Sequence, residues 1–600
     1  MRRILALCIL CLSIAPATAQ DAADTVAPEA AAEAGADSAF GSLSEPARAA
    51  LATKAEGRPV LAEDWMVAAA NPLAVEAGAD VLRAGGSAAD AMIAVQSVLG
   101  LVEPQSSGLG GGAFLVWYDA ASGAVTTLDG RETAPLAATP TLFQDDAGEP
   151  LDFFDAVVGG RSVGTPGTPA LLEAAHELWG TADWAGLFDP AIALAEDGFV
   201  VSPRLASLVA EDAERLGRFP ATAEYFLPGG TPLAEGDTLT NPAYAETLRA
   251  LATDGANAFY TGDIAQGVVE TVRGAAGNPG LLSATDLAIY AVRERAPVCV
   301  EYRAHEVCGM GPPSSGALTV GQILGTLENF ELAGGPDDVE TWRLVGDASR
   351  LAFADRGRYM ADSDFVPMPT AGLVDPAYLT ERAGLIAGRD AALSEATPGT
   401  PDWDHAQAWG DDASIEFPST SHISIVDSAG NALSMTTTIE NGFGSRLMTP
   451  GGFLLNNELT DFSFATHEDG RPIANRVEPG KRPRSSMAPT IVLRDGAPVL
   501  VVGSPGGSRI IGYVAQAVIN VVDFGMDAQA AVAAPHVLNR FGTMDLEAGT
   551  DAETLADPLG GLGFDTEVRE LTSGLHVIAI GPEGLTGGAD PRREGIALGE

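Results

Sequence analysis

Residues 418–440, "PSTSHISIVDSAGNALSMTTTIE", decide the fold that we expect for this chain. Apolar and polar residues alternate in "SHISIVD" and again in "ALSMTTTI", and the "SAGN" between them is typical of a turn. The stretch therefore predicts a β-hairpin. Three small hydroxyl residues, Ser419, Thr420 and Ser421, stand where its first strand begins. We interpret them either as a polar loop that enters the hairpin or as the place of a nucleophile.

Strand and helix patterns lie on both sides of this hairpin. Residues 488–503 predict a second hairpin, residues 508–524 a helix with one apolar face, and "GFLLNNE" (452–458) a further strand. Upstream, residues 71–104 predict two helices separated at Gly85 and Gly86, and residues 106–130 a glycine-rich loop followed by two strands. Hairpins accompanied by helices predict an α+β fold, in which helices cover antiparallel sheets.

The N-terminus has the pattern of a secretory signal peptide over residues 1–19. Arg2 and Arg3 precede an apolar run, and Ala17-Thr18-Ala19 forms an A-x-A cleavage site. Residues 20–57 are rich in Ala, Glu, Asp and Pro and predict a disordered lead-in, and the acidic residues 395–417 predict an exposed loop. The later sequence has no apolar run of about 18 residues. We expect a periplasmic or secreted protein.

Charge and motif spacing exclude several functions. The formal net charge of −47 would repel nucleic acids and anionic membranes. The seven histidines contain no H-x-x-x-H pair, so we expect no metal site. "GLGGGA" (108–113) precedes a strand, where a dinucleotide fingerprint would follow one, so we expect no cofactor. "GSPGGSRI" (503–510) lies between a predicted strand and a predicted helix, where backbone N–H groups can bind an oxyanion.

Two cysteines remain after the signal peptide, Cys299 and Cys308 in "APVCVEYRAHEVCGM". Strand-like runs flank "YRAH", so a hairpin would bring the two sulfur atoms together. An oxidising compartment favours a disulfide there, and two buried thiols are the alternative.

Thr420 has a route to nucleophilic chemistry that needs no histidine. A threonine hydroxyl is a weak nucleophile without a base. If the chain is cut before Thr420, the new α-amine, with a pKa of about 8, can accept the hydroxyl proton itself.

Seven motifs, in order along the chain, resemble those of the gamma-glutamyltranspeptidase family of N-terminal-nucleophile hydrolases. They are "PQSSGLGGGAF", "DGRETAP", "GPPSSGALTVGQ", "TSHISIVDSAGNALSMTTTI", "LLNNELTDFS", "GKRPRSSMAPTIV" and "VVGSPGGSRI", spread over about residues 60–595. The resemblance implies a four-layer αββα fold. It also implies self-cleavage between Ser419 and Thr420 into a large subunit, residues 58–419, and a small subunit, residues 420–600.

The resemblance also implies a role for each matching residue. It makes Thr420 the nucleophile, Thr438 its hydrogen-bond partner, Gly506 and Gly507 the oxyanion hole, Arg131, Ser485 and Ser486 the ligands of a substrate α-carboxylate, and Asp461 with Glu458 the ligands of its α-ammonium. The chain differs from the best-known members at Glu440, where asparagine is usual, and at Arg484, where leucine is usual. Glu440 would hold the ammonium or indicate another acyl group, and Arg484 puts a cation beside the two serines.

Three hypotheses of function follow. The first is a gamma-glutamyltransferase or glutathione hydrolase that forms a γ-glutamyl-threonine intermediate and passes the acyl group to water or an amino acid. The second is a related acylase for a dicarboxylic-acyl side chain, which Glu440 and Arg484 support. The third is an uncleaved periplasmic binding protein. The expected partners are a small-molecule substrate such as glutathione and the two subunits of one precursor.

Overall fold

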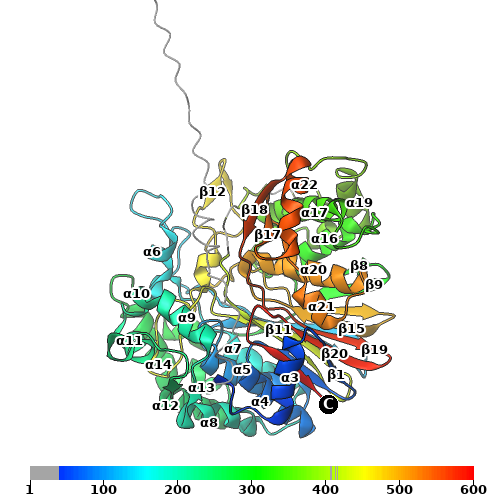
Figure 1. Cartoon of the computed structure of the whole chain (residues 1–600). Helices are drawn as coiled ribbons and strands as arrows, with labels where there is room; N and C mark the ends of the chain where they lie inside the picture. The colour runs from blue at the N-terminus through cyan, green and yellow to red at the C-terminus, as the bar shows by residue number, and fades with distance from the viewer. Residues whose placement is uncertain (1–38, 406–407, 413, 415) are drawn as a thin grey trace, which may run out of the picture.

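Two seven-stranded β-sheets form the centre of the molecule, and helices cover the outer face of each (Figure 1). The computed structural model describes residues 39–405, 408–412, 414 and 416–600. The expected signal peptide and the first part of the lead-in lie outside these residues. None of the helices in the described ranges combines the length and the apolar character that crossing a bilayer requires.

The first sheet contains the hairpin predicted from residues 418–440. Its strands, in spatial order, are β21 (Ile596–Gly599), β2 (Met66–Ala69), β10 (Ser421–Val426), β11 (Ala432–Thr438), β3 (Gly112–Asp119), β4 (Ala124–Gly130) and β7 (Arg293–Arg295). Strands β10 and β11 pair antiparallel with Ser421 opposite Thr437, so the predicted hairpin is confirmed.

The second sheet contains the other two predicted hairpins. Its strands, in spatial order, are β1 (Val60–Ala62), β20 (Gly584–Ala589), β19 (His576–Gly581), β15 (Ala497–Gly503), β14 (Thr490–Arg494), β9 (His305–Gly309) and β8 (Val298–Tyr302). Cys299 on β8 lies directly opposite Cys308 on β9, and the two form a disulfide. Three small sheets lie outside: β5 (Phe199–Val200) with β6 (Thr238–Leu239), β12 (His467–Glu468) with β13 (Arg471–Pro472), and β16 (Val537–Asn539) with β17 (Thr543–Glu547) and β18 (Asp565–Arg569).

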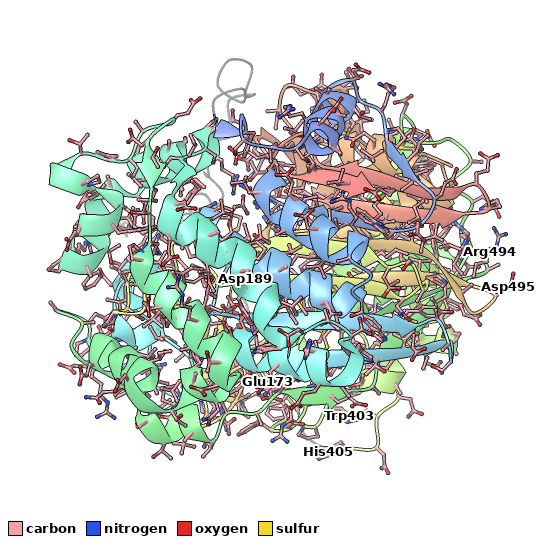
Figure 2. The ribbon with its side chains drawn as sticks, turned by 90° about the horizontal axis from the view of Figure 1, so that it is seen from below. Glu173, Asp189, Trp403, His405, Arg494 and Asp495 are labelled. Atoms are coloured by element: carbon pink, nitrogen blue, oxygen red, sulfur yellow. A yellow bond between two sulfur atoms is a disulfide. The ribbon has the colours of Figure 1, made fainter. Side chains whose placement is uncertain are left out.

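Helices bury the outer faces of both sheets. The first sheet packs mainly against α4 (Pro72–Arg83), α5 (Ala88–Val102), α7 (Thr168–Trp179), α8 (Asp189–Asp197) and α12 (Pro242–Asp254), which Figure 2 shows from below. The second sheet packs against α16 (Gly316–Leu327), α17 (Val339–Tyr359), α20 (Ile510–Val522) and α21 (Ala528–Ala533). The remaining helices are α3 (Glu45–Ala55), α6 (Phe153–Val157), α9 (Pro203–Glu211), α10 (Ala213–Leu216), α11 (Pro220–Phe226), α13 (Asn257–Tyr260), α14 (Gly262–Arg273), α15 (Ala284–Ala288), α18 (Thr370–Leu373), α19 (Pro376–Gly384) and α22 (Ala556–Gly561).

The alternation in β10 explains how the four layers hold together. Ile423 and Ile425 pack into the cluster that includes α4 and α5, whereas Val426 packs between the sheets. Side chains alternate along a strand, so Ser424 also faces the second sheet. Its Oγ donates a hydrogen bond of 3.0 Å to the carbonyl oxygen of His576 on β19. The αββα arrangement is thus confirmed, and the layer between its sheets is partly polar.

The lead-in differs from the disorder expected up to residue 57. Helix α3 occupies Glu45–Ala55 and begins at Ser44, whose side chain accepts a hydrogen bond from the backbone of the first turn. Phe40 and Leu43, just before it, are buried in the cluster of the first sheet's outer face. A few apolar residues thus suffice to hold a segment whose composition alone suggests disorder.

The strand expected at "GFLLNNE" is wrong. This segment makes only isolated bridges, Leu454 with Met448 and Leu455 with Gly110. The side chain of Asn456 donates to the carbonyl oxygens of Gly110 and Gly164, at 2.7 and 3.0 Å. These side-chain bonds hold the segment in an irregular path instead of a β-ladder.

Buried histidines predict that the fold is sensitive to acid. His422 lies between the sheets, and its ring contacts the hydroxyls of Thr436 and Ser424 at 2.9 and 3.0 Å. Burial lowers the pKa of His422 and His536 well below the usual range and that of His576 to about 3. Below pH 6.5 each of these imidazoles binds a proton in the unfolded chain but not in the folded chain, so its own contribution favours unfolding in acid. We expect each histidine to remove about 2 kcal/mol of stability between pH 7.5 and pH 5.

Denaturant unfolding at these two pH values measures this loss. The His422→Gln variant should lose less stability on acidification than the unchanged chain. His467→Gln is the matched control, because His467 is exposed, and it should leave the loss unchanged. A His422→Gln variant whose unfolding free energy changes between the two pH values by as much as that of the unchanged chain would contradict the prediction.

Candidate active site

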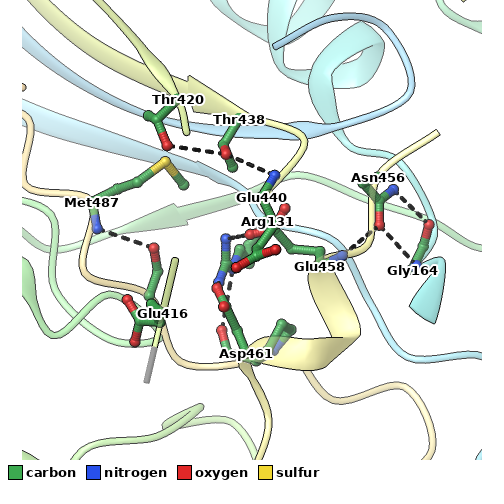
Figure 3. Close-up of polar contacts among 12 residues, drawn as sticks. Arg131, Gly164, Glu416, Thr420, Thr438, Glu440, Asn456, Glu458, Asp461 and Met487 are labelled. Carbon is green, nitrogen blue, oxygen red and sulfur yellow. Dashed lines mark hydrogen bonds and ion pairs between the residues drawn. The ribbon is translucent and has the colours of Figure 1, made fainter. Parts of the chain in front are cut away.

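One small cavity lies where β10 begins, and most of the candidate residues line it (Figure 3). Nine of them do so: Arg131, Thr420, Thr438, Glu440, Glu458, Asp461, Ser485, Ser486 and Gly507. Ser419 and Gly506 are neighbours of lining residues along the chain. Segments that are far apart in sequence are thus brought to one point.

The register of the hairpin places the two candidate threonines side by side. Ser421 lies opposite Thr437, so Thr420 and Thr438 occupy the next pair of positions. The Thr420 hydroxyl donates a hydrogen bond of 3.1 Å to Thr438 Oγ1, which also accepts from the backbone N–H of Glu440 at 2.8 Å. Thr438 therefore fixes the position of the Thr420 oxygen.

The backbone at Thr420 has an unusual conformation. Its φ is +133°, in a region that β-branched residues rarely adopt. The peptide on either side is held in place: Ser419 Oγ donates to the carbonyl oxygen of Gln105 at 2.9 Å, and Arg593 Nη1 donates to the carbonyl oxygen of Thr420 at 3.1 Å. The surroundings thus maintain a strained linkage, as is common at functional sites.

Two adjacent glycines form the turn between β15 and α20. Gly506 and Gly507 have φ of +134° and +57°. A Cβ atom on Gly507 would lie 2.5 Å from the carbonyl oxygen of Glu416 and 2.6 Å from the carbonyl carbon of Phe417. Conformation and close approach therefore both require glycine at position 507.

Arg131, in the loop after β4, is paired with two carboxylates on the short helix η4 (Glu458–Asp461). One guanidinium nitrogen contacts Glu458, and the other lies 2.5 Å from Asp461 Oδ2 (Figure 3). Burial alone would lower the pKa of Arg131, but these two carboxylates outweigh it and raise the pKa. Burial raises the pKa of both carboxyl groups well above the usual range, although Arg131 opposes the rise.

Glu440 lies next to this cluster. Its side chain accepts hydrogen bonds from the side chain of Asn457 and, at 3.3 Å, from the backbone N–H of Phe417. Burial, followed by the charge of Asp461, raises its pKa well above the usual range. Glu440, Glu458 and Asp461 thus all line the cavity, and this arrangement suits a cationic ligand.

The sequence did not predict a role at the cavity for Glu416, nor for Arg356, with which it pairs. Glu416 is 5% exposed and forms an ion pair with Arg356 on α17. The expectation that residues 395–417 form an exposed loop is thus wrong at its C-terminal end, where Asp412 is also buried, at 6% exposure. Nothing in the sequence indicates that this arginine, in a helix, and this glutamate, in an acidic segment, form an ion pair.

A buried threonine directly before a central strand, within an αββα fold, is the arrangement typical of N-terminal-nucleophile hydrolases. Comparison with known proteins gives the family. The gamma-glutamyltranspeptidase family model matches residues 74–600, and the chain belongs to that family.

Three relatives illustrate the range of the family. The chain is 39% identical to a glutathione hydrolase proenzyme of Bacillus subtilis (strain 168), over 90% of this chain and 92% of the relative. It is 35% identical to an acylase ACY 1 proenzyme of Pseudomonas sp. (strain V22), over 90% and 95%. The solved structure of a cephalosporin acylase from Bacillus halodurans superposes with a TM-score of 0.79 at 27% identity, over 90% and 97%. The chain is thus an enzyme of the gamma-glutamyltransferase and glutathione hydrolase class, which removes the hypothesis of a binding protein.

Proposed function

We propose that the chain cuts itself between Ser419 and Thr420, and that Thr420 then transfers γ-glutamyl groups to water or to an amino acid or peptide. The observation that carries this proposal is the buried Thr420 hydroxyl, held by Thr438 at a residue whose backbone φ is strained. The products of the cut are a large subunit that ends at Ser419 and a small subunit, residues 420–600. The signal-like residues 1–19 support export to the periplasm or outside the cell.

The cut begins with attack by the Thr420 oxygen on the carbonyl carbon of Ser419. The C–N bond of that peptide breaks, the hydroxyl proton is transferred to the departing nitrogen, and an ester joins the two segments. Water then hydrolyses the ester, which leaves a carboxylate on Ser419 and restores the Thr420 hydroxyl. The strained φ at Thr420 favours this exchange because the strain is released when the bond breaks.

The free Thr420 amine then serves as the base for catalysis. It accepts the hydroxyl proton while the oxygen attacks the γ-amide carbonyl of the donor, and it returns a proton to the leaving amine. The backbone N–H groups of Gly506 and Gly507 stabilise the oxyanion. Water or an acceptor amine then releases the acyl group from the threonine ester.

A γ-glutamyl donor carries both charges for which the cavity has partners. Its ammonium would lie among Glu440, Glu458 and Asp461, and its carboxylate near Arg131, Ser485 and Ser486. The alternative is an acylase for dicarboxylic side chains, which the similarity to the two acylases and the presence of Arg484 favour.

Turnover of two chromogenic anilides separates these functions. We expect kcat/KM for γ-glutamyl-p-nitroanilide to exceed that for glutaryl-p-nitroanilide at least about 10-fold, because the glutaryl chain leaves the buried carboxylates without their cation. Equal or faster turnover of the glutaryl compound would favour the acylase.

A further inference from the structure

Arg593, in the loop between β20 and β21, holds the backbone of Thr420 through a buried hydrogen bond. Its Nη1 donates to the carbonyl oxygen of Thr420 at 3.1 Å, and the arginine is 4% exposed. The hydroxyl of Thr420 is held separately, by Thr438. All three residues lie within 420–600, so both contacts stay inside the small subunit after the proposed cut. Thr420 therefore keeps its place when its amine becomes free.

The bound guanidinium lies close to the position of that future amine. The nitrogen and the carbonyl oxygen of one residue are joined through Cα, so Arg593 Nη1 lies within about 7 Å of the Thr420 nitrogen. Both residues are buried, and buried charges are screened by salt and water much less than exposed ones. A cation in this place disfavours a second positive charge on the amine.

Glu103, at the C-terminal end of α5, opposes the charge of Arg593. It is 1% exposed, and its Oε2 accepts a hydrogen bond from Ser421 Oγ at 3.1 Å. Arg204 Nε lies 3.6 Å from its other oxygen, and the backbone N–H of Arg204 donates to Glu594 at 2.9 Å. Burial raises the pKa of Glu103 to about 7, although the charge of Arg593 opposes the rise. Glu103 is thus only partly ionised near neutral pH and offsets Arg593 incompletely.

The carboxyl groups on the cavity side are compensated. Glu458 and Asp461 form ion pairs with Arg131. Burial raises the pKa of Glu440 well above the usual range, which favours its uncharged form. Glu416 also lines the cavity, but it belongs to the segment before the proposed cut. These groups therefore direct little net negative charge toward the amine.

The groups around the β20–β21 loop complete the electrostatic surroundings. Lys54 donates to two backbone carbonyl groups of this loop, and burial lowers its pKa to about 8. Asp590 forms an ion pair with Arg592. Burial lowers the pKa of His576 to about 3 and raises that of Tyr513, so both are uncharged at neutral pH. The other charged residues of the neighbouring cavity, which Ser419 and Arg593 line, are Glu211, Asp212, Arg215 and Arg446.

We propose that Arg593 is a positioning residue that holds the Thr420 carbonyl and lowers the proton affinity of the Thr420 α-amine, and that Glu103 partly offsets this effect. The inference rests on the proposed cut, which creates the amine. Only the neutral amine can accept the proton of the hydroxyl. An ordinary α-amine, with a pKa of about 8, is mostly protonated at pH 7. Arg593 thus keeps a larger share of the enzyme active at neutral pH.

The pH dependence of kcat/KM for γ-glutamyl-p-nitroanilide tests this role, because its acid limb reports the base of the free enzyme. We expect Arg593→Met to raise the apparent pKa of that limb by about 1, and Arg593→Lys, which keeps the charge, to leave it nearly in place. Glu103→Gln should move the limb in the opposite direction, to lower pH, by less than about 1, because Glu103 is only partly ionised there.

Opposite shifts from the two variants distinguish an electrostatic role from a structural one. Loss of a purely structural contact lowers the plateau of the profile but does not move its limb. Arg494→Met, at the exposed β14–β15 turn (Figure 2), is the control for removal of a distant cation and should change neither. Limbs that stay in place in both Arg593→Met and Glu103→Gln, or that move in the same direction, would overturn the inference.

A measurement on the unchanged protein decides the matter if the variants are not cut. Cyanate modifies only neutral amines, and mass spectrometry of the small fragment's N-terminal peptide follows its reaction from pH 5 to pH 9. We expect a pKa of about 7 for the Thr420 amine, and a value of 8 or above would overturn the inference. A fragment that begins at Thr420 with such an ordinary amine contradicts only this role of Arg593. A fragment with another first residue contradicts the proposed function.

Discussion

Thr420→Ala is expected to leave the precursor in one piece and to abolish turnover. The variant retains the fold, because the lost hydroxyl makes a single hydrogen bond to Thr438, but it has no nucleophile for the cut or for acyl transfer. We expect a single band on a denaturing gel and a loss of kcat of at least about 10⁴-fold with γ-glutamyl-p-nitroanilide.

Two neighbouring variants make this test specific. Thr420→Ser keeps both the hydroxyl and the future amine, so it should still be cut and retain activity. Ser421→Ala removes the next hydroxyl, which donates to Glu103 at 3.1 Å, and should also be cut. Cleavage of the Thr420→Ala chain between residues 419 and 420 would show that another group performs the attack.

Gly507→Ala is expected to have the second largest effect. The new methyl group would meet the main chain of Glu416 and Phe417 at about 2.5 Å, next to the bond that is cut. It would also strain a residue with φ of +57° and displace an N–H group from the oxyanion. We expect both the cleavage rate and kcat to fall about 10²-fold or more, measured by gel and by anilide release.

Gly525→Ala separates backbone strain from close approach. Gly525 follows α20 and has φ of +66°, similar to that of Gly507, but a Cβ atom there meets no atom within 4 Å. The Gly525→Ala variant should lower the free energy of unfolding by about 1 kcal/mol and leave the cleavage rate and kcat unchanged. A Gly507→Ala chain that is cut and turns over like this control would contradict the role of the glycine turn.

The central hairpin could be predicted from the sequence because its determinants are local. The alternation of apolar and polar residues determines which side of the sheet each side chain of β10 and β11 occupies. The short "SAGN" turn determines the register in which the two strands pair. That register in turn places Thr420 opposite Thr438. The strand predicted at "GFLLNNE" is wrong because the conformation of this segment depends on contacts that are not local. The side chain of Asn456 forms hydrogen bonds with Gly110 and Gly164, which are distant in the sequence.

The electrostatics of the cavity could not be predicted in the same way. Glu416 and Arg356 are 60 positions apart, and neither lies in a motif that the sequence displays. The pair exists because helix α17 and the segment before β10 pack against the same cavity. In the sequence, Arg484 differs from the usual leucine, but its buried ion pair with Asp412 is visible only in the structure.

The first residue of the small fragment, read by mass spectrometry from the purified protein, tests the account most directly. We predict a fragment that begins with Thr420, with an unmodified amine, and extends to residue 600. A fragment that begins at any other residue, or an active protein that consists of a single intact chain, would contradict it.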